Sequence, residues 1–112
     1  MSALERIEGK LPKGVRTSVA MEAGFYVGWH QERGWHCVTD RLPTVGEVVY
    51  AYGYRWDVGA DNLSSFMYRC FLGEDGLWTY RPSRDDGRDH TVIFESHQID
   101  FWREIPEEEK KP

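Results

Sequence analysis

The chain has 112 residues, of which 40% are hydrophobic and 29% charged, a composition that predicts one globular domain and excludes a wholly disordered chain. Nineteen acidic residues against fourteen Lys and Arg give a net charge of −5, so we expect no binding to polymeric nucleic acid, which requires a surplus of cations. We find no membrane-spanning apolar run, no signal peptide and too few cysteines for a disulfide framework, and therefore expect a cytoplasmic protein.

Residues 1–34 are predicted to be a partly ordered N-terminal extension. Ser2 and Glu5 stand three residues apart, as in a capping box, which predicts a short helix over residues 3–8. Further along, Phe-Tyr-Val at 25–27 favours a strand, since aromatic and β-branched residues prefer extended backbone. The residues just before this strand are compatible with a second short helix.

Residues 35–106 are predicted to be a single β-rich domain. Gly-Glu-Asp-Gly at 73–76 has the composition of a hairpin turn. The absence of strand–helix alternation favours an antiparallel sheet of about five strands, with one or two short helices near the N-terminus. This fold is mainly β in the α+β class, and a sheet curled into a small barrel like that of SH3 domains stays open as an alternative. The extended segments are 35–38, 47–56, 65–72, 77–80, 91–95 and 99–102.

The last residues, 107–112, form a charge run of Glu and Lys that ends in proline. Such a segment cannot bury apolar surface, so we predict a disordered tail.

Two short motifs of the chain resemble those of a known family. The first is Trp-His-Cys-Val-Thr-Asp-Arg-Leu-Pro at 35–43, followed by Gly46 and the strand at 48–52; the second is Ile-Asp-Phe-Trp-Arg-Glu-Ile-Pro at 99–106. Together they resemble the opening and closing signatures of the domain of unknown function family 551, over about residues 35–106. The resemblance implies a small domain common in bacteriophages and prophages, and it brings no established activity and no catalytic residues.

An aromatic stripe runs along the strand at 47–56. Period-two spacing places three tyrosines and a tryptophan on one face of this strand. The face can be core, but each buried tyrosine hydroxyl then needs a hydrogen-bond partner. Tyr, Trp and Arg are also enriched at protein interfaces, so the alternative is a partner-binding face. The residues that we expect to contact the partner are Tyr50, Tyr52, Tyr54, Trp56, Arg55 and Arg69.

A charged loop at 81–90 suggests a different use of the same face. Aromatic side chains stack on bases, and a local arginine cluster can bind the phosphate of a small nucleotide. The loop residues that we assign to this alternative are Arg81, Arg84, Arg88 and His90.

Residues suited to catalysis or metal binding lack the spacing that either chemistry requires. No pair of His or Cys has the close spacing of a zinc site, and no nucleophile motif surrounds a Ser or Cys. We therefore expect no enzyme activity, no metal and no cofactor. The candidate ligands considered are His30, His36, Cys37, Cys70, His90 and His97.

The function we predict is that of a phage-type accessory protein. It would act as a non-catalytic protein-binding module on a host or phage protein, for instance as an inhibitor of host defence or of a nucleic-acid-handling protein. An acidic domain suits the basic clefts of such proteins. The alternative is a protein that binds or sequesters a small nucleotide, and self-association through edge strands also stays open.

Overall fold

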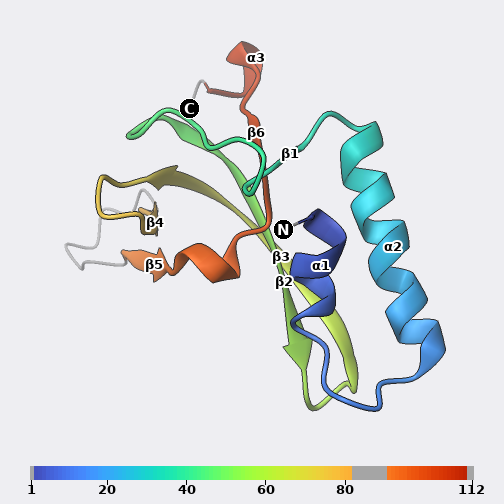
Figure 1. Ribbon diagram of the computed structural model, residues 1–112. Coiled ribbons are helices and arrows are strands. Elements are labelled where there is room, and N and C mark those ends of the chain that lie inside the picture. The colour runs from blue at the N-terminus through green and yellow to red at the C-terminus, as the bar shows by residue number, and fades with distance from the viewer. Residues whose placement is uncertain (1, 82–90, 111–112) are drawn as a thin grey trace.

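The computed structural model describes residues 2–81 and 91–110 (Figure 1). It is an α+β fold, in which six antiparallel strands form one open sheet in the order β1-β6-β2-β3-β4-β5. The strands are β1 (His36–Cys37), β2 (Val48–Asp57), β3 (Asn62–Leu72), β4 (Trp78–Tyr80), β5 (Val92–Phe94) and β6 (Phe101–Glu104). The helices are α1 (Ala3–Glu8), α2 (Thr17–Glu32), the 3-10 turn η1 (Ser96–Gln98) and α3 (Glu107–Lys110).

The first helix begins as the sequence predicts. The backbone N–H of Glu5 donates to the Ser2 hydroxyl at 3.1 Å, and the Ser2 N–H donates to the Glu5 carboxylate at 3.3 Å. This reciprocal pair is the capping box, and it satisfies two donors that a helix N-terminus would otherwise leave without partners.

The strand expected at 25–27 is wrong, because these residues lie in the middle of α2. Val19, Ala23 and Val27 are buried at a four-residue spacing, so they form one apolar side of a helix that packs onto the rest of the protein. Tertiary packing of this side outweighs the local strand preference of Phe, Tyr and Val. The second N-terminal helix is therefore sixteen residues long rather than short.

The antiparallel sheet is confirmed, and each predicted extended segment overlaps one of its strands. β2 and β3 pair over ten residues of register, from Val48 opposite Phe71 to Asp57 opposite Asn62. The predicted turn joins β3 to β4, where the Gly73 N–H donates to the Leu77 carbonyl at 2.9 Å. The sixth strand is β1, which is only two residues long.

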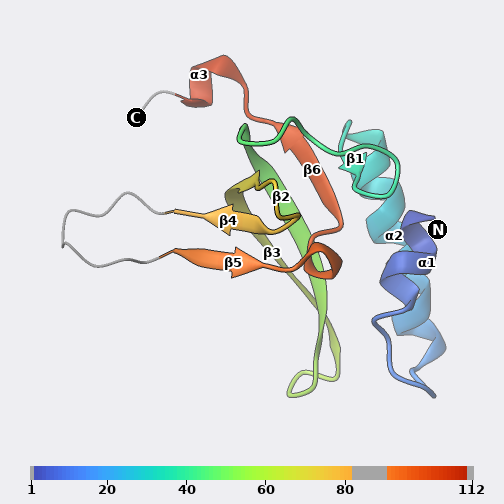
Figure 2. The same cartoon turned by 60° about the vertical axis from the view of Figure 1, so that its left-hand side comes forward.

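The barrel alternative is wrong, because the sheet stays open with β1 and β5 at its two edges. Figure 2 shows both N-terminal helices on one side of the sheet. In a barrel, the sheet would bury its inner face by closing on itself. Here the two helices cover that face instead, so the N-terminal extension and the β-rich part share one hydrophobic core. The helix-side core consists of Ala3, Ile7, Ala23, Val27, Cys37, Tyr54, Leu63 and Phe101. The opposite face has a second core of Val49, Ala51, Cys70, Leu72, Trp78, Ile99 and Trp102.

The two motifs that resemble family 551 lie side by side. β1 pairs with β6, with His36 opposite Trp102, and the Trp102 indole N–H donates to the Arg41 carbonyl at 2.7 Å.

The segment expected to be a disordered tail contains α3, and the Tyr50 hydroxyl donates to the Glu109 carboxylate at 3.0 Å. Both ends of the β-rich segment are therefore held by side-chain contacts.

Candidate functional site

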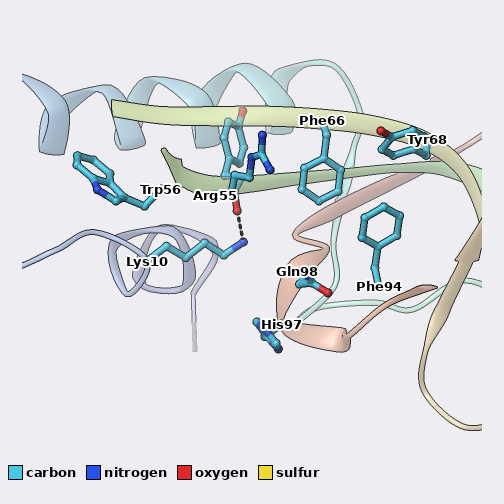
Figure 3. Close-up of a pocket in the computed structure, with 9 residues that line it drawn as sticks. Lys10, Arg55, Trp56, Phe66, Tyr68, Phe94, His97 and Gln98 are labelled. Carbon is cyan, nitrogen blue, oxygen red and sulfur yellow. Dashed lines mark hydrogen bonds between the residues drawn. The ribbon is translucent and has the colours of Figure 1, made fainter. Parts of the chain in front are cut away.

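A pocket of about 390 Å³ opens on the face of the β2–β3 pair that points away from α2 (Figure 3). Lys10 and Trp56 lie on one side of it, and the rings of Phe66, Tyr68 and Phe94 lie on the other. The remaining residues come from β2 and from η1, which joins β5 to β6. The lining residues are Lys10, Tyr54, Arg55, Trp56, Phe66, Tyr68, Phe94, His97 and Gln98.

The aromatic wall of the pocket is built by strands that meet only in the folded sheet. Phe94 of β5 stacks on Phe66 of β3, with ring centroids 5.1 Å apart and planes inclined by 15°. Tyr68 adds a third ring, 5.5 Å from Phe94. The wall is preformed, so a planar ligand would meet ring faces that are already in place.

Gly53 allows the floor of this pocket to form. It lies opposite Phe66 in the β2–β3 register. A Cβ at this position would stand 2.2 Å from the carbonyl oxygen of Gln98 and 2.4 Å from the Phe66 ring. Only glycine lets η1 and the ring approach the β2 backbone this closely.

A buried carboxylate holds the cation at the other side of the pocket. Asp100 is 1% exposed, and its oxygens accept hydrogen bonds from Arg6 Nε at 2.8 Å, Lys10 Nζ at 2.6 Å and the Tyr54 N–H at 2.9 Å. Lys10 also donates to the Tyr54 carbonyl at 2.6 Å, as drawn in Figure 3. Burial lowers the pKa of Lys10, and the Asp100 carboxylate opposes that shift without reversing it.

The charges around the pocket favour an anion even though the whole chain is acidic. Arg6 and Lys10 share one carboxylate, so their cluster keeps one positive charge. Arg55 adds a second cation at the rim, with its Nε donating to Ser64 at 3.2 Å. None of the nine lining residues is acidic. A small anion therefore meets local positive charge here.

The aromatic stripe predicted to bind a partner lies largely beneath the helices. Tyr54 is buried, and its ring stacks on Tyr26 of α2 at 5.1 Å. Tyr52 is half-buried, and its hydroxyl donates to Ser65 at 2.8 Å. The Tyr54 hydroxyl lies 3.2 Å from His30 Nδ1. These contacts supply the partners that tyrosine hydroxyls need inside a protein.

The other members of the predicted partner-binding set fall into two pairs, Tyr50 with Arg69 and Arg55 with Trp56. The exposed Arg69 side chain lies over the Tyr50 ring at 5.7 Å, near the end of the stripe that Glu109 contacts. Trp56 is half-buried and reaches the rim of the pocket. Arg55 points to the opposite face of the sheet, as the period of the strand requires.

The arginine-rich loop is described only at its first residue. Arg81 is exposed and lies over the Phe71 ring at 5.3 Å, and it does not line the pocket. Arg84, Arg88 and His90 lie outside the described residues.

His30 is the other buried polar side chain of the helix-side core. It stacks flat on Phe101, with centroids 4.4 Å apart, and its Nδ1 lies 2.9 Å from the Tyr26 carbonyl. Its Nε2 has no hydrogen-bond partner in the described part of the chain. Burial lowers the pKa of His30. Within residues 2–81 and 91–110, no group of three or more His, Cys, Asp or Glu could hold a metal ion.

Sequence reasoning missed Asp100 and Lys10. An acid between Ile99 and Phe101, in the short apolar strand predicted at 99–102, is the one local signal, because such a carboxylate must either face water or find cations. Lys10 carries no signal at all, since its role depends on where α1 ends in space.

Comparison with known proteins adds no relative, because no family model, no curated protein and no solved structure matches the chain. The likeness to family 551 thus depends on the two short motifs alone. None of the helices described here has the length and apolar character needed to cross a membrane.

Proposed function

We propose that the protein binds a small anionic aromatic ligand of the nucleotide class in the pocket between Lys10 and Phe94. The observation that carries this proposal is the combination of preformed ring faces with cations and no lining acid. The role that we propose is binding, because the lining offers ring faces and cations to a ligand.

The two parts of a nucleotide match the two sides of the pocket. A base can stack on Phe66, Tyr68 or Phe94, and stacking on an aromatic ring is worth about 1–3 kcal/mol per base. A phosphate can accept hydrogen bonds from Arg55 and from the Lys10 ammonium group, which form stronger bonds to charged oxygens than to neutral ones. The volume of about 390 Å³ lies near the lower end of the range of about 300–1,000 Å³ typical of ligand sites, which favours a mononucleotide.

A thermal-shift panel tests the proposal. It should contain purine and pyrimidine nucleoside monophosphates together with the matching nucleosides and inorganic phosphate. A ligand present at a hundredfold excess over its Kd raises the stability of the fold by about 2.7 kcal/mol. We expect a shift of several degrees with nucleotides, and smaller shifts with nucleosides or phosphate alone.

Variants locate the site. Arg55→Ala removes a rim cation, and Arg69→Ala is its matched control because Arg69 is also an exposed arginine, near the far end of the β2–β3 pair. Arg55→Ala should weaken nucleotide binding at least tenfold, whereas Arg69→Ala should leave it unchanged. A panel without any shift at millimolar ligand, or equal losses in both variants, would contradict the proposal.

Binding to a host or phage protein stays a prediction. Its phage context depends on the likeness to family 551, and most of the aromatic face that it named is covered by α1 and α2. A phage origin, an inhibitory role and a protein partner are therefore expectations that the pocket does not address.

A further inference from the structure

The outer side of α2 carries a line of exposed apolar side chains. Figure 1 shows α2 as the outermost element on its side of the fold. Met21, Phe25 and Trp29 are 61%, 73% and 46% exposed. Their four-residue spacing places them in one row along the helix.

This helix is apolar on two opposite sides. Val19, Ala23 and Val27 cover the inner side, and the exposed row covers the outer one. Glu22 and Glu32 are the only acidic or basic residues in α2, His30 aside. A surface helix normally carries polar residues on the side opposite its buried side, so we expect the exposed apolar row of α2 to be covered by a partner.

We propose that this occupant is a second copy of the chain, whose α2 packs antiparallel on the first about a twofold axis at Phe25. The row is symmetric about Phe25, because Met21 precedes it by four residues and Trp29 follows it by four. An antiparallel pair thus sets Phe25 against Phe25 and Met21 against Trp29 of the second copy. Both are favourable contacts, between two rings and between a thioether and a ring.

Two glycines beside the row permit a close approach of the helices. Gly24 and Gly28 have no heavy atom within 4 Å of the place where a Cβ would stand. The distance between packed helices depends on the side chains at their contact, and these two positions contribute none. The outer side of α2 therefore leaves room for another helix to pack closely against it.

Charge also favours the antiparallel arrangement. With the axis at Phe25, Glu32 of one copy lies beside the first turn of α2 in the other, next to Arg16. A carboxylate is stabilised at a helix N-terminus and by a neighbouring guanidinium group. The three side chains of the row pass from water to protein in the dimer, and none of them is an acid.

The exposed area predicts a weak dimer. Large side chains of this kind bury about 150–250 Å² each, so the exposed parts of the three residues amount to about 350 Å² per copy. Doubling gives about 700 Å², below the roughly 1,200 Å² at which stable interfaces begin. We therefore expect a reversible dimer with a Kd of tens of micromolar, as for small interfaces.

Sedimentation equilibrium between about 5 and 300 µM tests the dimer. The intact chain should shift from monomer to dimer across this range. Phe25→Glu places two like charges at the axis and should weaken association at least tenfold, without loss of folding because Phe25 is exposed. Val58→Glu is the matched control, since Val58 is 83% exposed in the turn between β2 and β3, and it should dimerise like the parent chain.

Cysteine cross-linking tests the antiparallel geometry. Phe25→Cys should form a disulfide-linked dimer under mild oxidation, because the two sulfurs meet at the axis. Met21→Cys should not, since two copies of residue 21 would lie about 12 Å apart along the helices at 1.5 Å per residue, beyond the reach of a disulfide. The native Cys37 and Cys70 are buried and should not interfere.

Any one of the following results would overturn the proposal. They are a monomer at 300 µM, a dimer that survives Phe25→Glu, and cross-linking of Met21→Cys in place of Phe25→Cys. A dimer lost in Ile93→Lys instead, on edge strand β5, would assign self-association to the sheet edge and equally refute the α2 interface.

Discussion

Replacing Asp100 by asparagine removes one negative charge and keeps the shape of the side chain. In the native structure this carboxylate is 1% exposed and lies against two cations, Arg6 and Lys10, whose side chains are only 16% and 17% exposed. The variant would keep these cations in place without their counter-charge. An uncompensated buried charge is expensive, because water can no longer solvate it fully.

The loss of stability should be about 3 kcal/mol. Breaking a buried ion pair on one side costs about 3–5 kcal/mol, and asparagine keeps one oxygen acceptor, so the lower end applies. In a domain of this size each kilocalorie lowers the Tm by about 4 °C, which predicts a fall of about 12 °C. Urea unfolding followed by tryptophan fluorescence would measure the free energy directly.

A matched control separates burial from charge. Glu104→Gln makes the same chemical change in a carboxylate that is 56% exposed and lies 3.8 Å from His36. Exposed ion pairs contribute about 0–1 kcal/mol, so this variant should unfold at nearly the parent midpoint. Equal losses below about 1 kcal/mol in both variants would refute the reasoning, because they would show that water screens the Asp100 cluster as well.

Four other predictions come from the packing of single residues. Gly53→Ala should lose about 3 kcal/mol in urea unfolding, as expected for overpacking, because its Cβ would stand 2.2 Å from the Gln98 carbonyl oxygen. Gly24→Ala, whose Cβ meets open space, should instead gain about 0.5–1 kcal/mol from helix propensity. Burial lowers the pKa of His30, so the unfolded chain takes up its proton first as the pH falls below about 6.5. Its contribution to stability is complete above that pH and should decline by at most about 1.4 kcal/mol at pH 5.5, a decline absent from a His30→Phe variant. Burial raises the pKa of the Cys70 thiol to about 12, so iodoacetamide should label it only after unfolding, as mass spectrometry of the native and denatured protein would show.

Helices, strands and turns of this fold could be predicted from the sequence wherever the structure depends on a few neighbouring residues. The capping box at Ser2 and Glu5 predicts α1 because its hydrogen bonds join residues three positions apart. The glycine-bounded turn at 73–76 predicts the β3–β4 hairpin for a similar reason. Alternation along 48–56 predicts β2 as a strand, because the period of a strand is two.

The helix α2 shows where sequence reasoning fails. Its inner row of Val19, Ala23 and Val27 has helical spacing, but the outer row around Phe25 is apolar too. The helical period in hydrophobicity is therefore hidden, and the strand preference of Phe-Tyr-Val is what remains visible. If a second copy of the chain covers the outer row, that row can be apolar. The alternation of apolar and polar sides that marks a surface helix is then missing from the sequence.

The sequence by itself determined where the strands of residues 35–106 lie, their antiparallel class and the acidic balance of the chain, because these depend on neighbouring residues and on composition. Tertiary structure alone decided that the Tyr54 face lies under helices and that the sheet stays open. It also decided the pocket, whose walls come from residues as far apart in the chain as Lys10 and Phe94. No local pattern encodes that meeting, since it depends on the strand order and on the one glycine, Gly53, that lets Gln98 approach the sheet.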